Sequence, residues 1–322
     1  MKNKSILYSI SALSIAAVLT FSSCAKKKAF KNEDGQASED NRDANGENDQ
    51  AVNDANNAVF GTTKLSGKGV NVADVSAITG TIQGGVVDTA GINNGTIKIN
   101  YNGTTVNNRT RTGSIQLTII DYAQGKRWKQ AGCVIRVDYL AYKVTRASDG
   151  KSFELNGTQY LTNETGGTWW ELIITKTQSS LGTSVTGSNL NVTFSDGKTA
   201  TYNINRRITY TIPGNILTCT AEGIGSSDGL SSLENYGTTR DGDAFTSQVT
   251  TPIVWNLTCG PWAPTAGKVT IKVAEKEFEL KCTFAVNQSG DPVEVAPNTC
   301  AYGWKVEWTH KKKTKNKIFG YK

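Results

Sequence analysis

The stretch LNVTFSDGKTATYNI, residues 190–204, decides the fold class of this chain. Apolar side chains alternate with polar ones up to Phe194, and the alternation resumes after the pair Asp196-Gly197. A period of two is typical of a strand with one buried face, and Asp-Gly favours a tight turn between antiparallel strands. This stretch therefore predicts a β-hairpin.

The same pattern recurs on both sides of the hairpin. The alternating apolar positions are Ile97, Ile99 and Tyr101; Ile115, Leu117 and Ile119; and Val269, Ile271, Val273, Phe278, Leu280, Cys282 and Phe284. Residues 137–143 continue the pattern less cleanly, and no stretch after residue 60 shows a sustained period of 3.6. We therefore predict an all-β domain over residues 60–322, an antiparallel hairpin or meander β-sandwich-like arrangement. A division into two sub-domains would fall near residues 213–250.

The N-terminus has the three parts of a secretory signal. Lys2 and Lys4 precede an uncharged apolar run, which is too short and wrongly flanked for a membrane span. Ser22 and Ser23 directly precede Cys24, which resembles the lipobox of bacterial lipoproteins, where the cysteine is acylated and the signal is cleaved. We expect residues 1–23 to be a signal peptide and Cys24 to carry the lipid. The alternative is an ordinary cleaved signal with an incidental cysteine.

Residues 24–59 have the composition of a linker. From Lys31 to Asn57 the chain is almost entirely Asn, Asp, Glu, Gly, Gln and Ala. Such a segment buries too little apolar surface to offset the entropy of ordering it. Asn, Asp and Gly also disfavour a helix. We therefore predict a disordered tether between the lipidated cysteine and the β domain.

The formal net charge of +7 is unevenly distributed. Residues 24–59 contain five basic and eight acidic residues, whereas residues 60–322 carry a surplus of eight positive charges. A basic domain ordinarily suggests nucleic acid, but export removes that partner. The expected partners are the lipid bilayer, through acylated Cys24, and an envelope glycan or another envelope protein. Anionic lipid headgroups would complement the positive charge.

Residues that carry catalysis or bind metals are sparse. His310 is the single histidine and lies in a basic tail, which disfavours a histidine-rich metal site and a Ser-His-Asp triad. Residues 225–229 fit the letters G-x-S-x-G, but that motif needs a helix after the serine. We expect no metal, no cofactor, no catalytic residue and no enzymatic activity. A hydrolase of envelope or dietary glycans is an alternative, because two suitably spaced carboxylates suffice for it.

Four tryptophans are candidate ligand-binding residues. Neighbours in a strand point to opposite faces, so Trp169 and Trp170 cannot both belong to a single core. Trp304 and Trp308 share one strand face, about 13 Å apart, a spacing that suits stacking on an extended glycan. A carbohydrate-binding module is therefore another alternative. The competing interpretation is that these rings form the apolar face of the last strand.

Several phrases along residues 90–305 resemble uncharacterised lipoproteins of bacteroidete-type bacteria. They are NGTIKINY at 94–101, RTRTGSI at 109–115, SDGKS at 148–152, LNGT at 155–158 and TNETGG at 162–167. The segment NTCAY at 298–302 departs from the family's pattern around its last cysteine. The resemblance implies an all-β envelope lipoprotein and brings no catalytic residue.

Five cysteines follow Cys24, in a chain expected to reach an oxidising compartment. Two disulfides among five cysteines leave fifteen arrangements, so the sequence alone does not decide the pairing. The resemblance implies that Cys259 and Cys300 are the family's late cysteine pair, and we prefer this pairing. Cys133 is the expected buried free thiol. The alternative is that all five are unpaired core residues.

Two short signals complete the prediction. Asp88-Thr89-Ala90 resembles the acceptor that such bacteria O-glycosylate, which makes Thr89 a candidate site. Three lysines follow Ala25, where related surface-exposed lipoproteins usually carry acidic residues. We expect an outer-membrane lipoprotein facing the periplasm, with exposure at the cell surface as the alternative. Its predicted role is non-enzymatic, either structural or in binding.

Overall fold

The computed structural model describes residues 33–67, 82, 84–106, 108–168, 170–256, 258–259, 263–273, 277–296, 299–310 and 312–321. The predictions on Cys24, Trp169 and residues 25–32 lie outside this part of the chain. The chain forms two compact units. Unit 1 comprises Met1–Asp49 and Ile204–Lys322, and unit 2 comprises Gln50–Asn203.

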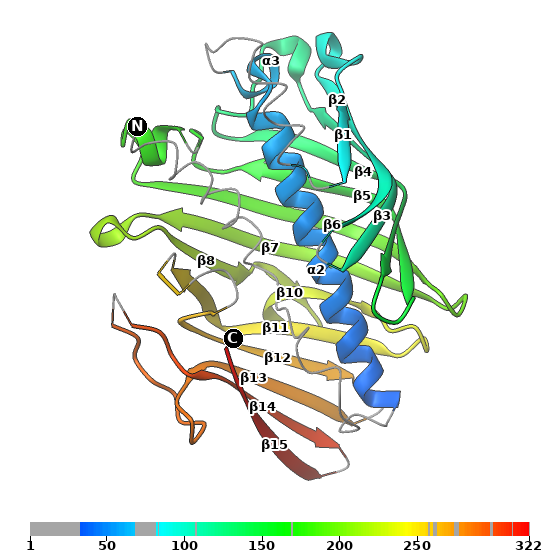
Figure 1. The fold of residues 1–322 in the computed structure, drawn as a ribbon, viewed down its shortest axis with the longest axis vertical. Coiled ribbons are helices and arrows are strands. Elements are labelled where there is room, and N and C mark those ends of the chain that lie inside the picture. Colours follow the sequence, from blue (N-terminus) through cyan, green and yellow to red (C-terminus); the bar gives the residue numbers. More distant parts are fainter. Residues whose placement is uncertain are drawn as a thin grey trace. The chain divides into compact units, whose positions relative to one another are not determined.

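Unit 2 is an antiparallel meander in which each strand pairs with the next along the chain (Figure 1). Its strands are β1 (Gly85–Asp88), β2 (Thr96–Val106), β3 (Arg109–Ile119), β4 (Cys133–Arg146), β5 (Ser152–Asn163), β6 (Ser180–Phe194) and the first part of β7 (Thr199–Thr211). Its short helices are α3 (Thr63–Ser66), η2 (Ile92–Asn94), η3 (Tyr122–Gln124) and the π-helical turn η4 (Trp170–Ile174). The prediction of an all-β, antiparallel fold is confirmed.

The predicted hairpin at residues 190–204 is present. β6 ends at Phe194, whose N–H donates a hydrogen bond to the carbonyl of Lys198 at 2.9 Å. Gly197 adopts a φ of +81°, a left-handed conformation that glycine adopts without steric cost. Leu190, Val192, Phe194, Ala200 and Tyr202 are all buried, so the alternation does place the apolar side chains on one face.

Unit 1 contains the second part of β7 and eight further strands of the described residues. They are β8 (Thr218–Gly223), β9 (Gly225–Ser227), β10 (Leu230–Thr238), β11 (Ala244–Asn256), β12 (Ala266–Val273), β13 (Phe278–Val286), β14 (Gly303–His310) and β15 (Lys313–Gly320), with the short helix η5 (Pro213–Asn215). Strands β10 to β15 pair in chain order, and β9 pairs with β10.

The division between the units differs from the predicted break near residues 213–250. Strand β8 lies within that segment and pairs with both β7 and β11. Because these pairings join the segment to strands before and after it, residues 213–250 belong to unit 1. The chain divides instead between Asn203 and Ile204, inside β7.

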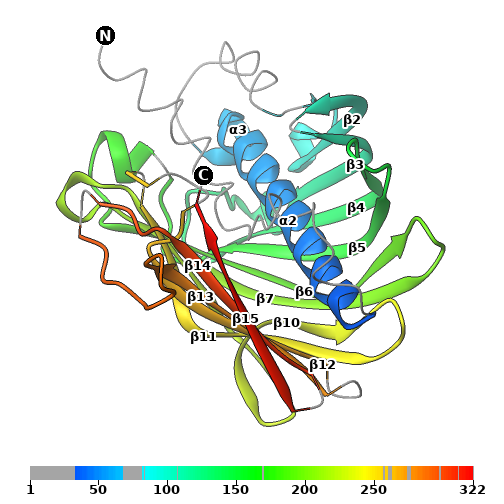
Figure 2. The ribbon, with the colours of Figure 1, turned by 60° about the horizontal axis from the view of Figure 1, so that its bottom comes forward.

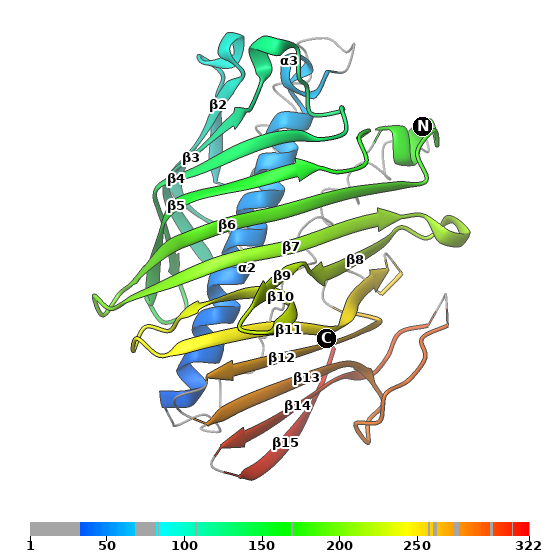
Figure 3. The ribbon, with the colours of Figure 1, turned by 180° about the vertical axis from the view of Figure 1, so that it is seen from behind.

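A helix of 28 residues, α2 (Glu33–Phe60), occupies most of the segment predicted to be a disordered tether. Its first part, through Asp49, belongs to unit 1, and its second part, from Gln50, belongs to unit 2. In each unit the helix covers one face of the strands: it lies in front of them in Figure 1 and behind them in Figure 3. The structure therefore differs from the prediction over residues 33–59.

The physical reason for this difference is tertiary packing. Buried residues of α2 form four series with a spacing of seven: Asp40, Glu47 and Asp54; Ala44, Ala51 and Ala58; Asn48 and Ala55; Val52 and Val59. A spacing of seven residues returns to nearly the same side of a helix. The alanines allow the helix to approach the strands closely, and contacts with the strands supply the stability that its own composition lacks.

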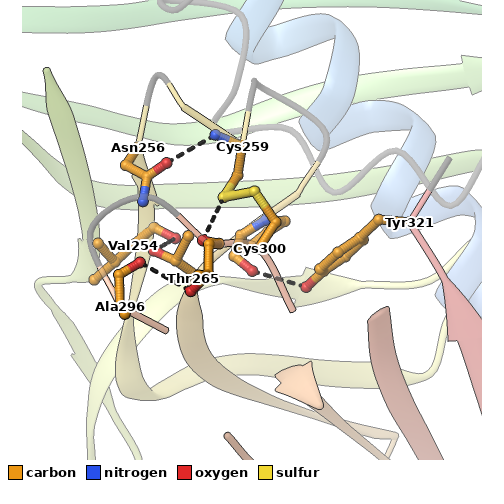
Figure 4. Close-up of a disulfide and its surroundings, with 9 residues drawn as sticks. Val254, Asn256, Cys259, Thr265, Ala296, Cys300 and Tyr321 are labelled. Atoms are coloured by element: carbon orange, nitrogen blue, oxygen red, sulfur yellow. Dashed lines mark hydrogen bonds between the residues drawn. A yellow bond between two sulfur atoms is a disulfide. The ribbon is translucent and has the colours of Figure 1, made fainter. Parts of the chain in front are cut away.

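The predicted disulfide between Cys259 and Cys300 is present, with Cα atoms 5.5 Å apart. It joins the segment after β11 to the segment before β14 (Figure 4). The N–H of Cys259 donates to Oδ1 of Asn256 at 2.8 Å. Nearby, the Tyr321 hydroxyl donates to the carbonyl of Pro264 at 2.8 Å. The disulfide thus joins two loops of unit 1, and Tyr321 is hydrogen-bonded to the loop between β11 and β12.

The three other cysteines in the described part of the chain, Cys133, Cys219 and Cys282, are buried and lie outside the disulfide. The prediction that Cys133 is a buried free thiol is confirmed. Burial raises the pKa of the Cys133 thiol to about 11. This thiol is therefore protonated at neutral pH, a state that disfavours nucleophilic chemistry.

Candidate functional site

Two of the four predicted ligand-binding tryptophans, Trp304 and Trp308, have described side chains. Trp169 lies outside the described residues, and Trp170 begins the turn η4, with a side chain that also lies outside them. Trp304 is 7% exposed, and its ring stacks on those of Phe319 and Tyr321, with centroids 5.2 and 5.6 Å away. Trp308 is half-buried. Trp304 is thus a core residue, as the competing interpretation predicts.

The remaining predicted positions lie in turns and loops. Thr89 is half-exposed and directly follows β1, where Oδ1 of Asp88 accepts a hydrogen bond from the N–H of Ala90 at 2.9 Å. Modification of Thr89 stays a prediction. The G-x-S-x-G segment forms β9 and the turn into β10 rather than a strand followed by a helix. It therefore lacks the geometry that exposes a nucleophilic serine.

The second part of α2 covers strands of unit 2 (Figure 2). A polar cluster joins this part of the helix to β2. The Tyr101 hydroxyl on β2 donates to Oδ2 of Asp54 at 2.7 Å. Nε2 of Gln50, one helical turn before Asp54, donates to Oδ1 of the same carboxylate at 2.8 Å. Asp54 is 1% exposed and Tyr101 is 6% exposed. The carboxylate is therefore removed from water and accepts one hydrogen bond from its own helix and one from β2.

Two further tyrosines extend this cluster along β4. The ring centroid of Tyr142 lies 5.0 Å from that of Tyr101 and 5.8 Å from that of Tyr139. Nε2 of Gln159 on β5 donates to the Tyr139 hydroxyl at 2.8 Å. We call Asp54, Gln50, Gln159 and the three tyrosines the tyrosine cluster. All three tyrosine rings are buried.

A β-bulge brings Tyr139 and Tyr142 to the same face. Residues three apart in a regular strand point to opposite faces. The register between β4 and β5 shifts between Tyr139 and Tyr142, and Ala141 has a φ of +49°. One extra residue in a strand produces such a shift and moves the following side chains to the other face. This bulge explains why apolar and polar residues alternate less regularly over residues 137–143.

Burial raises the pKa of Tyr101 well above its ordinary value of about 10. The adjacent negative charges of Asp54 and, on ionisation, Tyr142 raise the pKa further, whereas Arg111 lowers it. The phenol therefore stays protonated at neutral pH and acts as a hydrogen-bond donor to Asp54. It does not supply a general base.

Replacing Tyr101 by Phe should lower the free energy of unfolding of unit 2 by about 1–3 kcal/mol, because it removes a donor from a buried carboxylate. A raised folded-state pKa contributes stability that is present below about pH 10 and is lost as the pH rises through the folded pKa. The wild-type chain should thus lose stability above about pH 10, and Tyr101→Phe should lose less there. Urea unfolding between pH 7 and 11 measures both effects.

Tyr160→Phe is the matched control, since Tyr160 is 42% exposed on β5. A change at an exposed tyrosine is expected to stay within about 0.5 kcal/mol. Equal stabilities for the two variants at pH 7 would show that the bond between Tyr101 and Asp54 contributes nothing measurable.

The first part of α2 is attached to unit 1 by a buried ion pair. Nε and Nη2 of Arg240 lie 2.6 and 2.7 Å from the two carboxylate oxygens of Asp40. The two side chains are 16% and 5% exposed. A two-point contact between guanidinium and carboxylate fixes direction as well as distance. Arg240, in the turn between β10 and β11, thus positions the first part of α2.

A second buried charge pair lies among the strands of unit 1. Nε of Arg206 on β7 is 3.7 Å from Oε2 of Glu234 on β10, and both side chains are 3% exposed. The Ser247 hydroxyl on β11 donates to Oε1 of Glu234 at 2.7 Å. Three strands of unit 1 therefore meet through one carboxylate.

Asp40 and Asp54 attach α2 to the rest of each unit. The Asp40 carboxylate accepts from Arg240 in the turn between β10 and β11, and the Asp54 carboxylate accepts from Tyr101 on β2. Within the described ranges, His, Cys, Asp and Glu side chains do not gather in groups of three that would suit a metal ion. Sequence reasoning missed Asp40, Asp54, Tyr101 and Arg240 as a set. The sequence did contain one signal for these contacts, the spacing of seven residues between acidic residues of α2.

The comparisons with known proteins return no similarity: no family model, no curated protein and no solved structure matches the chain. None of the helices in the described part of the chain has the length and apolar character needed to cross a bilayer.

Proposed function

We propose that the chain is a membrane-anchored bacterial envelope lipoprotein with a non-enzymatic role, structural or in binding, and that α2 holds its β strands close to the bilayer. The observation that carries this proposal is the position of α2 in the sequence. The helix begins at Glu33, nine residues after the predicted lipid-bearing Cys24. Among the described side chains of the helix, Asp40 is the first that is buried, and it binds Arg240.

The length of chain between lipid and helix limits how far unit 1 can be from the membrane. Nine residue steps span at most about 30 Å, whatever their conformation. A disordered tether through residue 59 would allow 35 steps and more than 100 Å. Because α2 is docked on the strands, the segment between the predicted lipid and the helix is nine residue steps long instead of 35. A structural or docking role next to the bilayer uses this arrangement directly.

The contacts of α2 in each unit can hold the strands of that unit to the helix. Asp40 binds Arg240 in unit 1 through two hydrogen bonds. Asp54 binds Tyr101 in unit 2. A helix of this composition is marginal in isolation and depends on its packing. In each unit the strands and the part of α2 that packs on them therefore depend on each other, and the helix is the element nearest to the predicted anchor in the sequence.

The test is the chemistry of Cys24 in cells. Mass spectrometry of the mature N-terminus should find an acylated cysteine at position 24, and the protein should partition into detergent. Cys24→Ala should abolish that partition, because firm attachment requires two or more acyl chains. Cys133→Ala is the matched control, since it removes a buried free thiol and leaves the lipobox intact. Unchanged partition of Cys24→Ala would refute the anchor.

A further inference from the structure

The last strand of unit 1 presents a row of lysines on one face. Lys313, Lys315 and Lys317 alternate with Thr314 and Asn316 along β15, and all five residues are exposed. Alternation places the three lysines on the same side, with successive Cα atoms about 6.8 Å apart. Their partners in β14 are His310, Trp308 and Val306. We call Lys313, Lys315 and Lys317 the lysine row.

Aromatic residues border the lysine row. Nζ of Lys317 lies 4.9 Å from the centroid of the Phe319 ring, which continues the same face of β15. Trp308, opposite Lys315, is half-buried. Apolar rings beside ammonium groups on long stems match the boundary between acyl chains and headgroups, where such side chains place an apolar body below a polar tip.

The lysine row lies on an edge strand of unit 1. β15 pairs with β14 and is the last strand of the series, so its outer edge has no strand beside it in the described structure. Lysines on an edge strand also discourage pairing with another chain. That explanation accounts for charge on β15, but it predicts no affinity for a surface.

The place of the row relative to the predicted anchor supports a membrane partner. In Figures 1 and 3 the connected ends of β14 and β15 lie at the same end of unit 1 as the first turn of α2. Glu33 in that turn can be no more than about 30 Å from Cys24 along the chain. If Cys24 is acylated, this end of unit 1 is the end held nearest to the bilayer.

We propose that the lysine row binds anionic phospholipid headgroups of the bilayer that holds the anchor, and so orients unit 1 on the membrane. This inference rests on the proposed lipid anchor. Charge complementarity carries it, since residues 60–322 have a surplus of eight positive charges and three of them stand in this row. Each lysine near an anionic surface strengthens binding about fivefold, so the three together contribute roughly 100-fold.

The experiment measures binding without the lipid. Residues 24–322 with Cys24→Ser are sedimented with vesicles of phosphatidylcholine containing 30% phosphatidylglycerol, and with vesicles of phosphatidylcholine alone. The unmodified row should bind the anionic vesicles and lose affinity as salt rises. The triple variant Lys313→Gln, Lys315→Gln, Lys317→Gln should bind roughly 100-fold more weakly, with an unchanged melting temperature.

The matched control replaces three exposed lysines elsewhere, Lys143, Lys151 and Lys268, by Gln. It makes the same change in net charge, and its binding should fall no more than a few fold. Equal losses in both variants, or no loss in the row variant, would overturn the proposal. Binding that a soluble acidic polysaccharide supports and anionic vesicles do not would overturn it as well.

The outcome is independent of the test of Cys24. An acylated Cys24 together with a row variant that binds vesicles normally would refute the lysine row and leave the anchor in place. Vesicle binding that depends on the row, together with a Cys24 that carries no lipid, would refute the anchor and leave the row as a peripheral membrane contact.

Discussion

Replacing Arg206 by Met should lower the free energy of unfolding of unit 1 by about 3–5 kcal/mol, because the change leaves the buried carboxylate of Glu234 without its positive partner. Both side chains are 3% exposed, so water cannot replace the guanidinium. The Ser247 hydroxyl alone, at 2.7 Å, offsets a small part of the desolvation of a full negative charge. Denaturant unfolding, followed by amide exchange in β10 and β11, measures the change.

Two controls separate this effect from a general loss of charge. Arg136→Met removes an arginine that is 49% exposed, beside Asp138, and should cost at most about 1 kcal/mol. The double variant Arg206→Met with Glu234→Gln should recover much of the stability, since no unpaired charge is left buried. A single variant as stable as the wild type would show that water reaches Glu234.

Replacing Trp304 by Ala should cost about 3–5 kcal/mol in the stability of unit 1 through the cavity that it leaves. The ring is 7% exposed and stacks on Phe319 and Tyr321. Tyr321 also donates to the carbonyl of Pro264 and accepts from the N–H of Ala285, so its position depends on the ring beside it. Loss of Trp304 should therefore loosen the attachment of β15 to the loops near the disulfide.

The control for this cavity is Trp304→Phe, which keeps an aromatic ring and should cost clearly less. Thermal unfolding of both variants gives the comparison, and amide exchange of Tyr321 and Ala285 reports the loosening. Retention of Trp304→Ala on envelope polysaccharides should equal that of the wild type at temperatures where both are folded. Loss of retention without loss of stability would make Trp304 a binding residue and contradict its assignment to the core.

The strands could be predicted because burial of one face of a strand leaves a pattern in the local sequence. A side chain that alternates between core and solvent leaves a period of two in the sequence, and Asp196-Gly197 marks a turn by its backbone preference alone. The hairpins at residues 190–204 and at β12–β13 followed from these rules. The pairing of Cys259 with Cys300 came from a resemblance, since spacing alone left fifteen arrangements.

Helix α2 and its docking contacts were decided by the tertiary structure. Composition showed that residues 24–59 could not order themselves alone, and this inference about the isolated segment stands on ordinary helix propensities. It could not show that the turn between β10 and β11 supplies Arg240 for Asp40, or that β2 supplies Tyr101 for Asp54. These partners are 200 and 47 residues away in the sequence, and hydrogen bonds between distant residues leave no local pattern. By itself the sequence determined the regularly alternating strands, the turn at Asp196-Gly197 and the polar character of the N-terminal segment. Only the folded strands decided that this segment is a helix, because its stability comes from the partners that they present.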